Sequence, residues 1–373
     1  MLPRKSGRCS RNVVCSKLVL AVALFVVAYI LIFPVGQANA ADTPTWPVEP
    51  PDSLLTTYSH AVVFEQYPAS REIENRVLDG PEEWRAWGYL MRATRILSEQ
   101  MDFGDTVGSA VYQTSLDSAV RLFTSALDQH PDAPSKIQAS WHAALGTLYT
   151  LQSQRAFDIE QSAIASIRFA GKGFEENSLA LDLDPDRLET KANALLYEFW
   201  RSRALSFLAW TPFVDDRREE ALKGLWAIAR SGGVASEVAI RGFAWALIEA
   251  NRNHEAAALA DSVLAVRGNV RGLLEPAGKA LFLEQRWDEA ADRYYRLVES
   301  VRQAPRRNET REVGALHRLG HIEAARGNWA DVVRIVNEAE SVPLDAEQKK
   351  RKKDDLRRLA RLREQAREAL DEQ

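Results

Sequence analysis

Hydrophobic and polar positions follow a helical period along almost the whole chain from about residue 53 onward. Apolar side chains recur at spacings of three and four residues, alanine and leucine are abundant, and the alternation typical of a half-buried strand is absent. The pattern therefore predicts an all-α fold. A chain of 373 residues is long for one compact core. Its length suits a solenoid, in which each helical unit contacts only its neighbours.

Three short stretches near the C-terminus, around Ala256, Ala290 and Val332, are similar to one another. Ala256 precedes Ala290 by 34 residues, and Val332 follows Ala290 by 42. A period of 34 residues with two helices per unit is typical of helical-hairpin repeats. We therefore expect a run of such hairpins over about 237–343.

The preceding part of the chain is less regular. Two units, at about 82–131 and 139–185, retain the ends of the repeat pattern. Gly146 and Gly173, however, are 27 residues apart, which is longer than the hairpin of a regular unit. Long helices or inserts are expected here.

The first forty residues have the order of a targeting segment. A basic start without acidic residues is followed by an apolar run over 18–33 and by the small-residue site Ala38-Asn39-Ala40. This order predicts a secretory signal peptide over 1–40, cleaved after Ala40. The alternative is an uncleaved membrane anchor through 18–33. Both interpretations export the rest of the chain, to the periplasm or the extracellular space, or facing the periplasm from the inner membrane.

The two ends of the exported part differ from its middle. The proline-rich segment 41–52 is expected to be an extended linker before a solenoid over 53–343. In 344–373, a basic run is followed by apolar residues at spacings of three and four, which predicts one charged amphipathic helix. We expect this helix to cap the apolar edge of the last repeat. The alternative is an electrostatic contact with anionic lipid or an acidic partner.

Charge and cysteine content exclude several classes of function. Cys9 and Cys15 both precede the apolar run, so the exported part has no thiol for a disulfide or a metal. The formal net charge is −4, and removal of the five basic residues of the first forty leaves −9. A mildly acidic protein is a poor candidate for binding nucleic acid, which needs a basic face.

Candidate chemistry is sparse. No nucleophile elbow, phosphate loop, dinucleotide fingerprint or zinc-protease motif occurs. His317 and His321 are four residues apart on one predicted helix face and could chelate a metal, but no third ligand is apparent and two surface histidines are the simpler explanation. We therefore expect no metal, no cofactor and no catalytic residues.

The placement of small and aromatic residues resembles the tetratricopeptide repeat family. Gly88 follows Trp84 and Trp87, and the pairs Gly278 with Leu281 and Leu319 with Gly320 repeat the theme. The resemblance is clearest over about 237–343. It implies a right-handed solenoid of helical hairpins, with irregular long-helix units and a C-terminal capping helix.

In that family the first helix of each hairpin lines a concave groove. With Gly88, Ala244, Gly278 and Gly320 as the small contact residues, the resemblance implies a partner-binding set of cations, aromatics and a few carboxylates. The set is Arg85, Tyr89, Arg92, Arg241, Trp245, Glu249, Glu275, Lys279, Phe282, His317 and His321. Arginine and lysine bind carboxylates, and aromatic rings supply desolvated contact area.

These observations predict an exported, non-catalytic scaffold or adaptor that binds a protein or peptide partner along its concave face. One alternative is an envelope protein that binds carbohydrate or a small ligand on its tryptophans. Another is a membrane-anchored assembly factor. An enzyme with a cleft in 139–236 is the last alternative, for which no catalytic motif is visible.

Overall fold

The computed structural model describes residues 46–205 and 215–372, and helices make up most of both ranges. Neither range contains a strand. The helices are α2 (Asp52–Val63), α3 (Tyr67–Leu78), η1 (Glu82–Trp84), α4 (Arg85–Phe103), α5 (Ser109–Gln129), α6 (Ser135–Asp158), α7 (Ala163–Leu183), α8 (Leu188–Ala204), α9 (Arg218–Ser231), α10 (Gly233–Glu249), α11 (Asn253–Arg267), α12 (Arg271–Leu283), α13 (Trp287–Gln303), α14 (Glu309–Ala325), α15 (Trp329–Ser341), α16 (Ala346–Arg351) and α17 (Lys353–Asp371).

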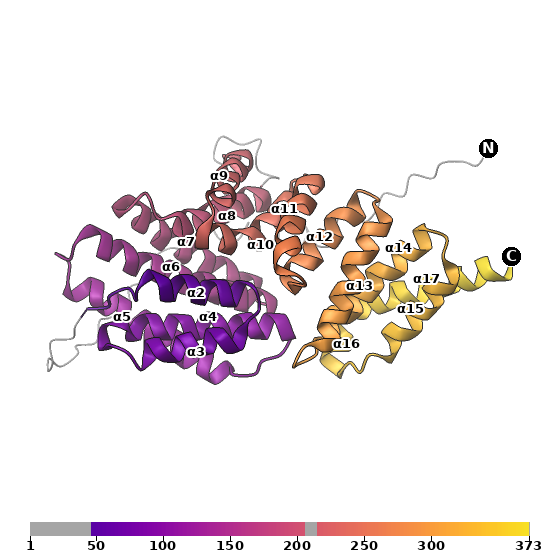
Figure 1. The fold of residues 1–373 in the computed structure, drawn as a ribbon, viewed down its shortest axis with the longest axis horizontal. Coiled ribbons are helices and arrows are strands. Elements are labelled where there is room, and N and C mark those ends of the chain that lie inside the picture. The colour runs from indigo at the N-terminus through magenta and orange to yellow at the C-terminus, as the bar shows by residue number, and fades with distance from the viewer. Residues whose placement is uncertain (1–45, 206–214, 373) are drawn as a thin grey trace.

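Successive helices pack against each other along the chain, which confirms the predicted all-α helical solenoid (Figure 1). The core is correspondingly divided. One hydrophobic cluster extends from Tyr58 to Leu151, and a second extends from Ala192 to Ala366. The array is therefore stabilised by contacts between neighbouring units rather than by one central core.

The predicted signal segment 1–40, with its apolar run, lies outside the described residues. Within the part of the chain that the structure describes, no helix combines the length and the hydrophobicity needed to cross a bilayer.

The hairpins over 237–343 have the predicted repeat geometry. Ala256, Ala290 and Val332 are fully buried in the first turns of α11, α13 and α15. A Cβ atom at Gly278 would lie 3.0 Å from the ring of Tyr294 on the return helix, so this position permits the close approach of α12 and α13.

A recurring turn joins the two helices of these hairpins. Asn251, Gln285 and Gly327 adopt positive φ values of 60°, 60° and 76°. In each case the next N–H donates to the carbonyl five residues earlier, at 2.8 to 3.0 Å. This is the Schellman arrangement that ends a helix. Glu65, at φ 62°, makes the same turn between α2 and α3. Residues 52–78 are therefore a further hairpin.

The irregular unit predicted around Gly146 and Gly173 is a pair of long helices, α6 and α7. A Cβ atom at Gly173 would lie 3.1 Å from the carbonyl oxygen of Gly146, and one at Gly146 would lie 2.3 Å from Oδ1 of buried Asn177. The two glycines thus allow the helix backbones to approach closely. The 26 intervening residues are the ends of both helices and the turn between them.

The C-terminal segment differs from the single helix expected. It consists of α16 and α17, which meet at Lys352. Asp345 and Gln348 form a capping box that starts α16. Leu359, Leu362 and Ala366 of α17 are buried against α14 and α15, so α17 covers the edge of the last hairpin.

The glycine contact between α6 and α7 gives a direct test of the packing. We expect Gly146→Ala to lower the free energy of unfolding by ~1–3 kcal/mol, because the added methyl group would overlap Asn177. Gly171→Ala is the matched control, since no atom lies within 4 Å of its Cβ position, and it should raise stability by ~0.5–1 kcal/mol. Urea unfolding of both variants measures this. Equal effects would contradict the packing described.

Candidate functional site

A buried carboxylate joins the N-terminal hairpin to the second half of the array. Glu65 lies in the turn between α2 and α3, and its side chain is 5% exposed. Its oxygens accept hydrogen bonds from the backbone N–H groups of Arg271 at 3.2 Å and Gly272 at 2.8 Å, which begin α12. A carboxylate is favoured at this position because the first N–H groups of a helix lack partners within the helix.

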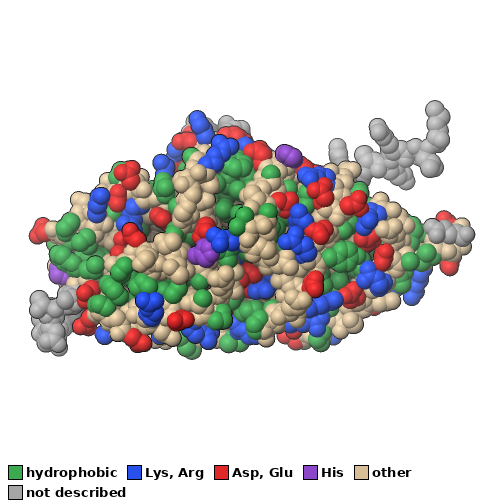
Figure 2. All heavy atoms as spheres, viewed as in Figure 1, with side chains coloured by type: hydrophobic (Ala, Val, Ile, Leu, Met, Phe, Trp, Pro, Cys, Tyr) green, Lys and Arg blue, Asp and Glu red, His purple; other side chains and the backbone are tan. Residues whose placement is uncertain are grey.

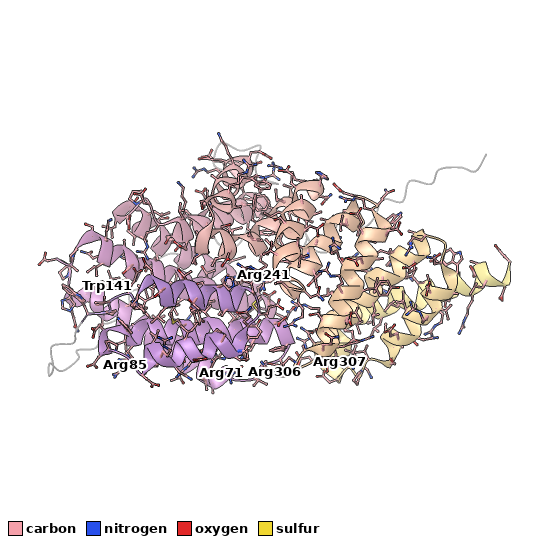
Figure 3. All side chains as sticks on the ribbon, viewed as in Figure 1. Arg71, Arg85, Trp141, Arg241, Arg306 and Arg307 are labelled. Carbon is pink, nitrogen blue, oxygen red and sulfur yellow. The ribbon has the colours of Figure 1, made fainter. Side chains whose placement is uncertain are left out.

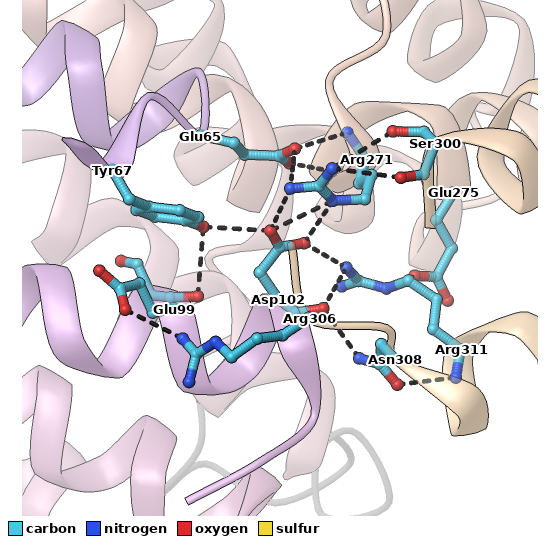
Figure 4. A network of polar contacts seen from close by, with 12 residues as sticks. Glu65, Tyr67, Glu99, Asp102, Arg271, Glu275, Ser300, Arg306, Asn308 and Arg311 are labelled. Atoms are coloured by element: carbon cyan, nitrogen blue, oxygen red, sulfur yellow. Dashed lines mark hydrogen bonds and ion pairs between the residues drawn. The ribbon is translucent and has the colours of Figure 1, made fainter. Parts of the chain in front are cut away.

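Asp102, near the end of α4, makes the second and stronger connection (Figure 4). It accepts from Arg271 Nε at 2.9 Å and from Arg311 Nη1 at 2.7 Å, across 169 and 209 residues of sequence. Burial alone would raise the pKa of the Asp102 carboxyl, but the hydrogen bond from Arg271 and the charge of Arg311 outweigh burial and lower it. Burial and the charge of Asp102 raise the pKa of Glu65.

The loop after α4 completes the connection. Asn308 donates from Nδ2 to the Asp102 carbonyl at 2.9 Å, and its Oδ1 caps α14 by accepting from the Arg311 N–H at 2.9 Å. Gly104 has φ 68°, and a Cβ atom there would lie 2.7 Å from Asn308 Oδ1. Only glycine fits this contact without strain. We call the contacts of Glu65 and Asp102 with α12 and α14 the clasp.

Next to the clasp, α2 packs against α10, and the concave face of the first hairpins encloses a cavity. The cavity has a volume of about 2050 Å³ and is open on part of its boundary. Helices α2, α4, α6, α7, α8 and α10 supply most of its wall, which is more apolar than polar. Its apolar side chains include Leu55, Leu90, Met91, Phe157, Phe174, Leu188, Leu196, Tyr197, Trp200, Val238 and Trp245.

Three of the predicted groove residues line this cavity: Arg241, Trp245 and Glu275. The guanidinium group of Arg241 covers Gly272 and lies 3.7 Å from Glu65 (Figure 3). Glu275 lies 3.5 Å from Arg311 Nε. The predicted set therefore touches the clasp as well as the cavity.

Arg85, Tyr89 and Arg92 of α4 do not line the cavity. Arg92 Nε donates to buried Glu74 of α3 at 2.6 Å. Tyr89 packs against the N-terminal core, and exposed Arg85 forms an ion pair with Glu82. Figure 3 shows Arg85 well apart from Arg241. These side chains face α3 and solvent.

The remaining predicted residues lie on α10, α12 and α14 outside the cavity wall. Glu249 forms an ion pair with Arg203 at 3.4 Å. Lys279 and Phe282 lie together on α12. His317 is not a surface residue, because it is 1% exposed. Its Nε2 lies 3.1 Å from Nε2 of His321. In the described residues, no group of three or more His, Cys, Asp or Glu side chains is arranged to hold a metal ion.

The clasp residues Glu65, Asp102, Arg271 and Arg311 are absent from the set predicted from sequence. Their partners are more than 160 residues away along the chain, so no local period marks them. One sequence signal was available. Glu65 occupies the turn position where other hairpins have Asn251, Gln285 or Gly327, and an acidic residue is unusual there.

No protein-family model matches this chain, and no curated protein matches it. An open apolar cavity surrounded by satisfied ion pairs is suited to recognition through burial of apolar surface.

The clasp should contribute strongly to stability. We expect Arg271→Met to lower the free energy of unfolding by about 3–5 kcal/mol, because it removes the main partner of buried Asp102. Arg286→Met, which breaks the largely exposed pair with Glu289, should cost less than ~1 kcal/mol. Chemical denaturation compares the two arginine variants. Similar losses of stability in both variants would show that the buried ion pair of Arg271 contributes no more than an exposed ion pair does.

The buried imidazole pair predicts an acid-sensitive contribution to stability. Burial lowers the pKa of the His317 imidazole from 6.5 to about 4 and also lowers that of His321. Because the folded-state pKa lies below the unfolded value, the unfolded chain takes up protons first as the pH falls. Stability present above pH 6.5 is therefore lost between pH 6.5 and about 4, by roughly 3 kcal/mol.

Denaturation at a series of pH values measures this loss. His317→Gln/His321→Gln should lose less stability than the wild type over the same interval, whereas His254→Gln, at an exposed histidine, should follow the wild type. An unchanged pH dependence in the double variant would show that the pair does not cause it.

Proposed function

We propose that this protein is an exported, non-catalytic binding protein that holds a segment of a partner protein in its concave cavity. The observation that carries the proposal is the cavity itself, with apolar side chains left partly exposed along its wall. Phe157, Leu188, Trp200 and Val238 are 55%, 37%, 41% and 38% exposed. Burial of such surface would stabilise a complex by about 25 cal/mol per Å² before the costs of association.

The size of the cavity favours a peptide segment over a small molecule. Sites for small ligands usually enclose about 300–1,000 Å³. The cavity measures about 2050 Å³. An extended or helical segment of a partner could contact several helices of the wall at once.

The charge of the cavity wall favours one kind of partner segment. Carboxylates outnumber guanidinium groups in the cavity wall. By contrast, acidic and basic side chains are interspersed over the face of the molecule seen in Figure 2. A partner segment with apolar residues and some basic ones would complement this wall.

The recurring Schellman turn and the buried small residues support assignment of the array to the tetratricopeptide type. Export rests on the segment 1–40, and so does the alternative of a membrane-anchored assembly factor tethered through 18–33. The second candidate function is binding of carbohydrate or a small ligand. Trp200 and Trp245 in the wall favour it, because indole rings stack on sugars and other flat ligands.

Photo-crosslinking in the producing cell tests the proposal. A photoreactive amino acid at position 238, in the cavity wall, should give discrete protein adducts. The same amino acid at position 266, a 77% exposed valine outside the wall, should not. A Trp200→Glu substitution should suppress the adducts at 238. Equal adducts at 238 and 266 would refute cavity binding. If position 238 gives no adducts and the tryptophan fluorescence responds to soluble glycans, the result would instead support binding of carbohydrate or a small ligand.

A further inference from the structure

Lys279 on α12 and Arg318 on α14 are partly buried, yet neither forms an ion pair with a described carboxylate. All the other lysines and arginines that are similarly or more deeply buried in the described ranges do form one. Arg95, for example, pairs with Glu74 at 2.7 Å. Partial burial of a cation without a counter-charge is unfavourable. The exception therefore points to a charge that a ligand would supply.

Both cations lie close to the same aromatic ring. Lys279 Nζ lies 5.8 Å and Arg318 Cζ 5.5 Å from the centre of the Phe282 ring. Phe282 is itself fixed by an edge contact with Trp287, at 5.5 Å between ring centres. Cation–aromatic attraction stabilises this arrangement. Burial, followed by the charge of Arg318, lowers the pKa of Lys279, and the charge of Glu249 offsets this lowering only in part.

The charges around the pair do not neutralise it. Arg358 on α17 adds a third cation, which is exposed and has no ion pair among the described residues. The nearby Glu249 is engaged by Arg203 at 3.4 Å. Asp355 is engaged by Lys352 at 3.1 Å and also lies 3.4 Å from Nδ1 of His317.

We propose that Lys279 and Arg318 form an anion-binding site between α12 and α14, to which Arg358 of α17 adds a third positive charge. The ligand class is an oxyanion, either a free inorganic ion or a group of carboxylates on a larger ligand. Guanidinium and ammonium groups donate several charge-assisted hydrogen bonds to such oxygens. The site is separate from the cavity, so it does not depend on the function proposed for the cavity.

Sulfate is the first probe, because it stays fully charged across neutral pH. We expect a sulfate titration of the full exported chain, at constant ionic strength, to shift the backbone NMR resonances around Lys279 and Arg318 saturably. Lys279→Gln/Arg318→Gln should weaken binding at least tenfold. Lys172→Gln/Arg230→Gln should bind as the wild type does. This control removes the same charge from two exposed, unpaired cations that also lie on aromatic rings, at 5.4 and 5.0 Å.

A second arm distinguishes the two sources of the anion. One outcome is that hexaglutamate binds at least tenfold more tightly than sulfate and loses this difference in Lys279→Gln/Arg318→Gln. That result indicates a carboxylate-bearing ligand. Weaker binding of hexaglutamate than of sulfate indicates a free ion. Arg358→Gln, at an exposed position that should not affect folding, is expected to weaken binding severalfold. The absence of saturable shifts in the wild type, or equal losses in the control double variant, would overturn the proposal.

Discussion

The buried carboxylate of Asp102 is the point on which the closed form of this array depends. Its ion pairs with Arg271 and Arg311 connect α4 to α12 and α14, which neighbour-to-neighbour packing would leave apart. A buried carboxylate is stable only when paired and hydrogen-bonded, so these contacts are linked in their formation. Glu65 and Asn308 add to them by capping α12 and α14. Together with the packing of α2 against α10, these contacts hold the first hairpin over the cavity.

The sequence predicted the parts of the fold that repeat locally. The positions of Ala256, Ala290 and Val332, and the close contact at Gly278, follow from a period and from small residues on a helix face. The break at Lys352 and the hairpin of α2 and α3 were missed, because single turns leave a weaker trace than whole helices do. The clasp could not be predicted, since pairing over 169 and 209 residues depends on the curvature of the whole array.

The predicted groove residues also show that local sequence patterns cannot predict contacts that depend on the whole array. The resemblance to tetratricopeptide repeats implied a common face for Arg241, Trp245 and Glu275, and these three residues do line the cavity. Arg92 has the same spacing but binds Glu74, because α3 covers that side of α4. Where the faces of the array remain uncovered, they differ in chemistry. The cavity wall is apolar with an excess of carboxylates, whereas the surface around Lys279 and Arg318 carries unpaired cations.

Amide hydrogen exchange of α2, followed by mass spectrometry in the wild type and in Asp102→Asn, shows directly whether Asp102 holds the array closed. We expect α2 and the first turn of α12 to be protected in the wild type. Loss of the carboxylate charge should accelerate exchange there, while α13 and α15 keep their protection. Rapid exchange of α2 in the wild type, or an unchanged α2 in the variant, would contradict a clasp that closes the cavity.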